Sequence, residues 1–326
     1  MLISICLPAY NGQEFIAAAI ESVLSQTHGQ FELLIADDCS TDGTYEIVQK
    51  YARDNNKIIS WQNEKRLGLF ANYNRCLEQA RGELIKPFAQ DDELKPTALS
   101  RMAEVFAATP ELALVACAKE QGHLYAARIE HEAERLPQGR VQGKEAILQC
   151  LSTQRNLIGE PVSVMFPARL KGTGFDTGYH SLGDLDYWFR LIEQGDLHYL
   201  SEELVTFRQH PGSSTSELLR NMDWVLDFFQ LSKTYEKYLS ELGSNRDQFC
   251  LRFVESAGTL IDQLSKAGKL EVGDLSGYRE VAYFAMRRCA ELGCKSREYD
   301  SVVQSTSWRI TEPLRSLVKM FGGDSR

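Results

Sequence analysis

Residues 81–94 read R-G-E-L-I-K-P-F-A-Q-D-D-E-L, an apolar run that ends in two adjacent carboxylates, Asp91 and Asp92. Such a run is typical of a buried parallel strand, and open α/β sheets bind their ligands at the carboxyl ends of these strands. Neighbouring carboxylates repel each other unless a cation neutralises them, and their oxygens suit Mg²⁺ or Mn²⁺. The stretch therefore predicts an α/β sheet with a divalent-cation site at its edge. A solvated acidic loop that caps the next helix is the alternative interpretation.

Strand-like and helix-like patterns alternate over the first 117 residues. Strand-like apolar runs occupy residues 2–9, 31–37, 57–61, 83–88 and 112–117, and helical patterns occupy residues 12–26, 43–54, 69–80 and 96–108. Strands that alternate with helices through short links predict parallel βαβ units. We therefore expect an α/β, Rossmann-like fold, with a mostly parallel, twisted sheet and helices on both faces. Asn11 is expected to cap the first helix.

The rest of the chain has different patterns. Residues 118–215 are mixed and rich in loops, and we expect them to complete one domain, 1–215, whose first half is residues 1–117. Residues 216–300 show helical spacing of apolar side chains, which predicts a helical extension that could be a dimer interface or a lid. In residues 301–326, apolar side chains, among them Trp308 and Phe321, are interleaved with Arg and Lys. This predicts either an amphipathic tail at a membrane interface or a terminal helix packed on its own domain.

Composition limits the classes of partner. The chain has 326 residues, a net charge of −9 and a pI of about 5.3, and an acidic chain is a poor candidate for general nucleic-acid binding. Eight cysteines without CxxC spacing predict reduced, buried thiols in a cytoplasmic protein. We expect no signal peptide and no membrane-spanning helix, because the start lacks a basic segment and no apolar run reaches about 18 residues.

Chemically distinctive side chains also follow the first two expected strands. Tyr10 follows the first of them, and Asp38 follows the second. Because the carboxyl ends of parallel strands meet at one edge, we expect both residues to lie beside Asp91 and Asp92. A ring that stacks on a base, a carboxylate that accepts an imide N–H and a bound cation together suit a nucleoside diphosphate. Alternatively, Tyr10 is a packing residue and Asp38 belongs to an Asx-turn or a helix cap.

Six segments, in this order, resemble the inverting family 2 glycosyltransferases, which share the GT-A fold. They are P-A-Y-N-G at residues 8–12, D-D-C-S-T-D-G-T at 37–44, R-L-G-L-F-A-N-Y-N at 66–74, Q-D-D-E at 90–93, G-D-L-D-Y-W-F-R at 183–190 and R-Q-H-P-G-S at 208–213. The resemblance covers roughly residues 3–215. It implies a GT-A fold and transfer of a sugar from UDP or dTDP to a hydroxyl group of a saccharide.

The resemblance also implies roles for single residues. Donor nucleotide binding falls to Pro8, Tyr10, Asn11, Asp38, Arg66, Asn72, Asp91 and Arg208, and binding of Mn²⁺ or Mg²⁺ falls to Asp91, Asp92 and His210. Asp184 matches the catalytic base, which takes the proton of the acceptor hydroxyl in a single in-line displacement. Asp186 is the second candidate for the base. The alternative is that both residues only favour the start of a helix.

Two positions depart from the family's pattern. Ala89 occupies the first Asp position of the D-x-D motif, which leaves open which of Asp91 and Asp92 binds the metal. Gly183 stands where the family has a Glu before Asp184, so the usual acidic pair is incomplete. These departures keep open a non-catalytic nucleotide-sugar-binding protein with a decayed site. A nucleotidyltransferase is the other alternative, although the loop after the first strand lacks the Gly-rich, basic sequence expected of that class.

The end of the chain carries a further resemblance. Residues 305–315, S-T-S-W-R-I-T-E-P-L-R, resemble tails of bacterial glycosyltransferases that build surface polysaccharides. The resemblance implies an acceptor carried on a lipid at the inner face of the cytoplasmic membrane. We therefore predict a hexosyl- or N-acetylhexosaminyltransferase of polysaccharide, lipopolysaccharide or O-antigen biosynthesis, cytoplasmic and peripheral on that membrane.

Overall fold

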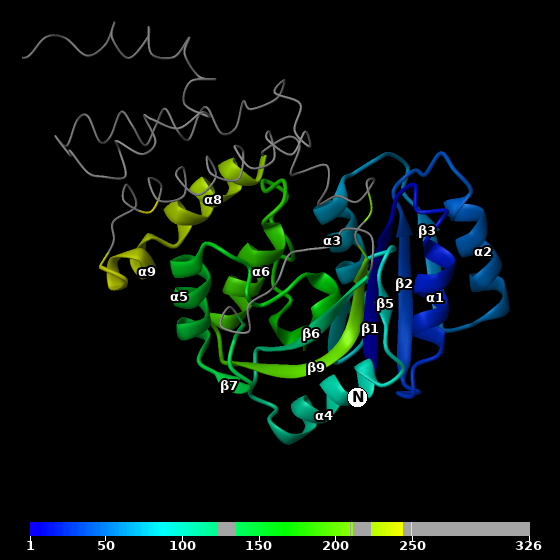
Figure 1. Ribbon diagram of the computed structural model, residues 1–326. Coiled ribbons are helices and arrows are strands. Elements are labelled where there is room, and N and C mark those ends of the chain that lie inside the picture. The colour runs from blue at the N-terminus through cyan, green and yellow to red at the C-terminus, as the bar shows by residue number, and fades with distance from the viewer. Residues whose placement is uncertain (123–134, 209, 211–222, 244–248, 250–326) are drawn as a thin grey trace, which may run out of the picture. The chain divides into compact units, whose positions relative to one another are not determined.

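The structure is a computed structural model, and it describes residues 1–122, 135–208, 210, 223–243 and 249 (Figure 1). The chain divides into two compact units. The first unit comprises residues 1–179 and 183–210, and the second comprises residues 180–182 and 211–326. Every residue predicted to bind the donor or the metal, or to act as the base, lies in the first unit.

A parallel sheet forms the first half of this unit. Its strands are β1 (Ile3–Ala9), β2 (Phe31–Asp37), β3 (Ile58–Gln62) and β4 (Leu84–Pro87), in the order β3-β2-β1-β4. The register sets Ala9 opposite Asp37 and Cys6 opposite Pro87. The residues that follow β1, β2 and β4 therefore emerge at one edge of the sheet, which is where an open α/β sheet binds ligands. This part of the structure confirms the predicted α/β fold.

The sheet becomes mixed beyond β4. The remaining strands are β5 (Glu93–Leu94), β6 (Leu114–Gly122), β7 (Gly139–Val141), β8 (Val164–Pro167) and β9 (Leu197–Arg208). Strand β8 lies antiparallel between β4 and β6, while β9 runs parallel to β6 and antiparallel to β5 and β7. The parallel pairing that we expected is therefore found among β1 to β4 and between β6 and β9, while the pairs that involve β5, β7 and β8 are antiparallel. An apolar run predicts a buried strand but carries no information on its direction.

Helices cover both faces of the sheet (Figure 1). They are α1 (Ile16–Leu24), α2 (Thr44–Asp54), α3 (Leu69–Gln79), α4 (Ala98–Ala108), α5 (Gly143–Thr153) and α6 (Gly183–Ile192). Apolar side chains of α1, α2 and α4 join Ile3, Ile5 and Leu7 of β1 in one buried cluster. Helix α3 packs on β1 and β2 through the strand side chains that alternate with those of this cluster. Cys76 of α3 contacts the carbonyl oxygen of Leu34 (3.7 Å).

An aromatic cluster joins α3 to α6. The ring of Phe175 lies 4.9 Å from Tyr73 of α3, and 4.6 Å and 5.8 Å from Tyr187 and Trp188 of α6, between centroids. All four side chains are buried. Such pairs contribute about 0.5–1.5 kcal/mol each beyond the area that they bury. The cluster thereby holds the first turn of α6, which carries Asp184, against the nucleotide-binding half.

The first helix begins later than predicted, and Asn11 does not cap it. Helix α1 starts at Ile16 and has no side-chain cap. Asn11 instead adopts a φ of +46°, a region that Asn tolerates better than most residues. Its backbone N–H donates to Ser40 Oγ (3.0 Å), and its Oδ1 accepts from the N–H of Thr41 (2.9 Å). Asn11 therefore joins the loop after β1 to the loop after β2.

The described residues of the second unit include two helices, α8 (Asp223–Thr234) and α9 (Glu236–Glu241). The carboxylate of Asp227 is buried and accepts hydrogen bonds from the backbone N–H groups of residues 180–182. Every described helix of the chain is too short or too polar to cross a bilayer. Most of the predicted helical extension and all of the tail, residues 301–326, lie outside the described residues.

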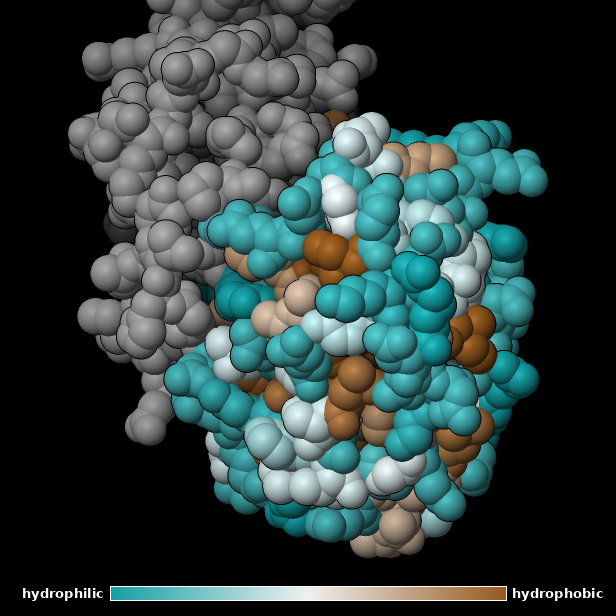
Figure 2. All heavy atoms as spheres, turned by 90° about the vertical axis from the view of Figure 1, so that its right-hand side faces the viewer, coloured by the Kyte–Doolittle hydropathy of each residue, from teal (hydrophilic) through white to brown (hydrophobic). Residues whose placement is uncertain are grey.

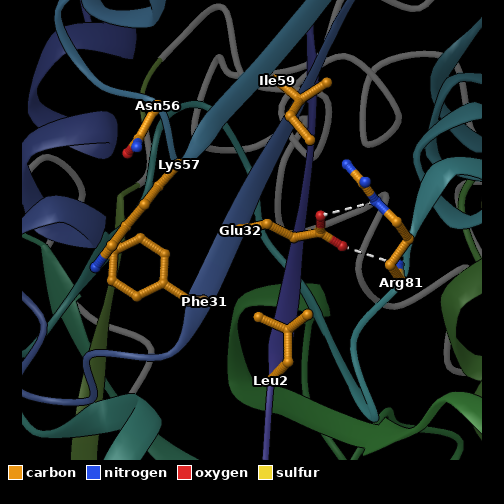
Figure 3. A pocket seen from close by; sticks show the side chains of 7 residues that line it. All are labelled: Leu2, Phe31, Glu32, Asn56, Lys57, Ile59 and Arg81. Carbon is orange, nitrogen blue, oxygen red and sulfur yellow. Dashed lines mark hydrogen bonds and ion pairs between the residues drawn. The ribbon is translucent and has the colours of Figure 1, made fainter.

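An open groove lies at the amino ends of β1 and β2, away from the predicted site (Figure 3). Its lining residues are Leu2, Phe31, Glu32, Asn56, Lys57, Ile59 and Arg81. Glu32 forms an ion pair with Arg81 (3.4 Å), and the Lys57 ammonium lies 4.3 Å above the Phe31 ring. The surface around α1, α2 and β3 is mainly hydrophilic, with small and separate hydrophobic patches (Figure 2).

Candidate active site

Tyr10 is held beside the acidic loop that follows β4. The side-chain amide of Gln90 accepts a hydrogen bond from the Tyr10 N–H (2.9 Å) and donates one to the Tyr10 carbonyl oxygen (2.9 Å). This double contact fixes the loop after β1 against the residue that precedes Asp91. A Cβ atom at Gly12 would lie 2.2 Å from Gln90 Oε1, so glycine leaves the space that the amide occupies.

Asp38 holds the loop that leads into α3. Its carboxylate is buried and accepts three hydrogen bonds, from the backbone N–H groups of Leu67 and Gly68 (2.8 Å each) and from Asn63 Nδ2 (2.9 Å). Gly68 has a φ of +90°, which favours glycine. In the same loop, the Arg66 guanidinium lies 4.0 Å from the centroid of the Tyr10 ring, a cation–π contact.

Asn72 and Pro8 lie beneath this edge. Asn72 Nδ2 donates to the carbonyl oxygen of Ala36 (2.7 Å), and Asn72 Oδ1 accepts from Asn63 Nδ2 (2.8 Å). The side chain is buried and therefore supports Asn63, which in turn bonds to Asp38. Pro8 is buried within β1, opposite Ala36. The contacts of both residues are thus with neighbouring residues of the protein. Their contact with the donor stays a prediction.

Asp91 and Asp92 meet the end of β9. Asp92 Oδ1 accepts from the backbone N–H of Arg208 (3.0 Å), and Arg208 Nε donates to the carbonyl oxygen of Asp91. His210 Nε2 lies 3.1 Å from Asp91 Oδ2. Burial, together with the charge of Asp91, raises the pKa of Asp92 well above its usual range. A bound cation or a proton would relieve this pair of carboxylates.

The donor atoms available suit Mn²⁺ or Mg²⁺. Asp91, Asp92 and His210 offer carboxylate oxygens and an imidazole nitrogen, a donor set that fits these ions. Among the described residues, no group of three or more such side chains is already arranged as a metal site. Mg²⁺ and similar ions are commonly held by one or two carboxylates with the remaining positions filled by water and substrate phosphates, so the residues present fit such an ion.

Two further side chains, Phe15 and Glu93, pack around this corner. The Phe15 ring lies tilted against the ring of His210, with 4.3 Å between centroids, and the Arg208 guanidinium lies 5.2 Å from the Phe15 centroid. Arg208 Nη1 pairs with Glu93 (3.0 Å). Arg208 Nη2 is buried and has no hydrogen-bond partner among the described residues. The guanidinium thus keeps a donor that can reach an oxygen of a bound anion.

Asp184 lies at the start of α6, against the first turn of α3. A Cβ atom at Gly183 would lie 2.7 Å from the Phe70 ring, so the space of a larger residue is filled by that ring. Phe70 comes two residues after Gly68, which Asp38 holds. Asp184 is 9% exposed. Its carboxylate accepts hydrogen bonds from the Leu185 N–H (2.7 Å) and from Asn156 Nδ2 (3.3 Å). Through Gly183, the start of α6 therefore packs against the start of α3, the helix that follows the loop carrying Arg66.

Asp186 points to a different set of partners. Its carboxylate is 3% exposed and pairs with Arg190 Nε (2.8 Å), four residues along the same helix. Arg190 Nη2 also donates to the carbonyl oxygen of Gly174 (2.8 Å). The Asp186 carboxylate is thus bonded to Arg190 of its own helix, whereas Asp184 is bonded to Asn156 of another segment.

Residues 156–160 form a turn between Asp184 and the acidic loop. Asn156 donates to the carbonyl oxygen of Gly159 (3.1 Å) and to Asp184, and Trp188 Nε1 donates to the same carbonyl (3.0 Å). Glu160, at the end of the turn, is one of the charges that raise the pKa of Asp92. Asn156, Gln90, Asn63 and Phe15 are absent from the residues predicted from the sequence. Of these four residues, only Gln90 belongs to a motif noted in the sequence, Q-D-D-E.

Comparison with known proteins identifies the family of the chain. Residues 4–156 match the model of glycosyl transferase family 2. The uncharacterized protein MT1568 of Mycobacterium tuberculosis is 32% identical over 69% of this chain and 73% of its own length. Bacillus subtilis TuaG, named as a teichuronic acid biosynthesis glycosyltransferase, is 36% identical over 32% of this chain. A Campylobacter jejuni protein named GalNAc(5)-diNAcBac-PP-undecaprenol beta-1,3-glucosyltransferase is 33% identical over 31% of it. The chain spans 41% of TuaG and 33% of the Campylobacter protein.

Solved structures share the fold. Staphylococcus aureus TarS, residues 1–349 with UDP-GlcNAc, has a TM-score of 0.65 at 18% identity, over 88% of this chain and 81% of its own. The mannosyltransferase PcManGT of Pyrobaculum calidifontis, with GDP-Man and Mn²⁺, has a TM-score of 0.56 at 16% identity, over 97% of this chain and 86% of its own.

The fold is the GT-A architecture that the sequence resemblance implied. The chain belongs to glycosyl transferase family 2. The predicted family and enzyme class are thereby confirmed.

Proposed function

We propose that this chain is an inverting glycosyltransferase that moves a hexosyl or N-acetylhexosaminyl group from UDP or dTDP to a hydroxyl of a lipid-linked saccharide. The observation that carries the proposal is the sheet edge at which Tyr10, Asp38 and Asp91 meet, with Asp184 joined to it through Phe70. Donor binding and proton removal can then occur side by side at this edge.

The nucleoside would bind at Tyr10, Arg66 and Asp38. The stacked pair of Arg66 and Tyr10 offers a flat, positively charged surface for a base. An ionised carboxylate has about four acceptor positions, and Asp38 uses three of them within the protein. The remaining position can accept the imide N–H of uracil or thymine. This chemistry supports UDP or dTDP as the donor nucleotide.

The diphosphate would lie between Asp92 and Arg208. Mn²⁺ or Mg²⁺ held by Asp91 and Asp92, with His210, would neutralise the charge that develops on the leaving diphosphate. Arg208 contributes the unpartnered Nη2 as a donor to a phosphate oxygen. Its backbone N–H and Nε, bonded to Asp92 and to the Asp91 carbonyl, keep the guanidinium at this position.

Asp184 would act as the general base. It takes the proton of the acceptor hydroxyl while that oxygen forms a bond to the anomeric carbon. The bond from the anomeric carbon to the diphosphate oxygen breaks in the same step, and its electron pair leaves with the diphosphate. Attack from the opposite face inverts the configuration. Asn156, which donates to Asp184 Oδ2, orients the carboxylate for this step.

The acceptor is proposed from the names of relatives. TuaG is named for teichuronic acid biosynthesis, and the Campylobacter relative is named for a saccharide on undecaprenyl diphosphate. The TuaG name supports a polysaccharide product, and the Campylobacter name supports a lipid-linked saccharide as the acceptor. A cytoplasmic enzyme resting on the inner face of the membrane would suit that substrate.

Donor binding is the first test. The full chain should bind UDP or dTDP more tightly than GDP by calorimetry, and Mn²⁺ should strengthen the binding. Arg66→Ala should weaken UDP binding by up to about 5-fold, because the guanidinium beside Tyr10 would stack on the base and a cation–π contact at an exposed position is worth about 0.5–1 kcal/mol. Lys65→Ala, at the exposed neighbouring position, is the matched control. Failure of both UDP and dTDP to bind with Mn²⁺ would reject the proposed donor.

The tail supplies a second test, of membrane association. Removal of residues 301–326 should release the protein from vesicles that contain anionic lipid, because the aromatic and basic side chains of the tail would bind that interface. UDP binding in the same truncated protein should be unchanged, which shows that it is folded. Truncated protein that still sediments with vesicles would contradict the role of the tail.

A further inference from the structure

Lys86 in β4 is an unusual buried residue. Its side chain is fully buried, whereas lysine is almost never buried without a partner. Its ammonium group donates to the carbonyl oxygens of Pro87 (3.1 Å), Val164 (3.1 Å) and Pro161 (3.4 Å), and most closely to that of Val162. Burial lowers the pKa of the amine to about 7, and the nearby Cys117 and Asp92 act against this shift.

The position of Lys86 in the sheet explains why these carbonyls need a donor. Strands β4 and β8 pair only at Leu84 with Pro167 and at Ile85 with Phe166. Beyond this point β4 offers no backbone N–H group to β8, because Pro87 has none. The segment opposite is the 3₁₀ turn η2 (Pro161–Ser163) and the start of β8. The ammonium of Lys86 takes over as donor at the place where the parallel half of the sheet meets the mixed half.

This contact lies between the two parts of the proposed site. Strand β4 leads directly into Asp91 and Asp92. The turn η2 directly follows residues 156–160, and the Ser163 N–H donates to the Glu160 carbonyl oxygen (2.8 Å). Asn156 in that turn donates to Asp184. One ammonium group therefore ties the strand that presents the acidic pair to the turn that orients Asp184.

We propose that Lys86 is a positioning residue for sugar transfer, which holds the turn at residues 156–160, and through it Asp184, in place beside Asp91 and Asp92. The inference rests on the proposed role of Asp184 as the base. Lys86 itself is buried beneath the site and touches neither donor nor acceptor. Its loss should therefore act on the chemical step and leave donor binding intact.

The test compares four variants of the full chain. Lys86→Met keeps the length of the side chain and removes its donors, and it should lower kcat by about 10- to 100-fold with unchanged affinity for UDP, because small misplacements of reacting groups cost about this much. In the Asp184→Asn background, Lys86→Met should cause little further loss, because both changes act through one carboxylate. Lys57→Met, at the amino-edge groove, is the control and should leave kcat unchanged.

The outcomes separate this inference from the proposed function. Full turnover in Asp184→Asn would reject Asp184 as the base, and with it the inference about Lys86, which rests on that role. Loss of turnover in Asp184→Asn, with an unchanged kcat in Lys86→Met or with losses that multiply in the double variant, would overturn the inference about Lys86 alone. If Lys86→Met does not fold, Asn156→Ala can be tested instead. It removes the hydrogen bond from the turn to Asp184 and leaves Lys86 unchanged. An unchanged kcat in Asn156→Ala would overturn the inference as well.

Discussion

Asp184→Asn is expected to lower kcat for sugar transfer by about 10²- to 10⁴-fold, the usual contribution of a general base. The amide cannot take the proton of the acceptor hydroxyl, while the size of the side chain is kept. UDP affinity should change little, because Tyr10, Asp38 and the acidic pair that would bind the donor are left intact. Rates measured with a radiolabelled donor, together with calorimetry of UDP, give both quantities.

Asp186→Asn is the matched variant in the same helix. It weakens a partly buried ion pair and removes the carboxylate that pairs with Arg190, a change that costs less than the about 3–5 kcal/mol typical of a fully buried pair. Its main effect should therefore be a lower melting temperature, whereas Asp184→Asn should lose activity at nearly native stability. A large loss of kcat in folded Asp186→Asn, with full turnover in Asp184→Asn, would exchange the roles of the two residues.

Asp92→Asn is expected to abolish the effect of Mn²⁺ on donor binding. Changes one step removed from a metal commonly weaken its binding by about 10- to 100-fold, and loss of a ligand should cost at least as much. Without metal, the variant should be no less stable than the wild type, because a buried carboxylate beside Asp91 is replaced by a neutral group. Thermal unfolding with and without Mn²⁺ and UDP separates the two effects.

Two comparisons sharpen this experiment. Asp91→Asn identifies which carboxylate dominates, a point that Ala89 in the motif leaves open. Asp54→Asn, an exposed carboxylate at the end of α2, controls for the change of net charge. Stabilisation by Mn²⁺ and UDP that persists unchanged in both Asp91→Asn and Asp92→Asn would reject the metal site.

The part of the fold that the sequence predicts well is the parallel half. Apolar runs located β1, β2 and β4 to within a residue or two, and parallel pairing then places Tyr10, Asp38 and Asp91 at one edge. Local pattern suffices here because burial on both faces leaves a continuous apolar run. The direction of β8 could not be predicted from the sequence, because it depends on pairing with β4 and β6, which are distant from β8 in the chain.

Side-chain partners at the site were harder to predict for the same reason. Gln90 bonds to Tyr10 across 80 residues, and Gly183 packs against Phe70. From the sequence, Gly183 suggested a decayed site, whereas the structure gives it a packing reason. Asn72, predicted to contact the donor, has both ends of its amide bonded within the protein. Motifs identify which residues gather at an edge, but orientation depends on neighbours that come from other segments.

The most direct measurement is a crystal structure of the chain with UDP and Mn²⁺. Our account predicts the uracil ring against Tyr10 and Arg66, its imide N–H on Asp38, and the cation on Asp91 or Asp92, with Asp184 facing the terminal phosphate. UDP bound elsewhere, for example at the amino-edge groove beside Phe31, or an Asp184 carboxylate turned away from the bound diphosphate, would contradict it.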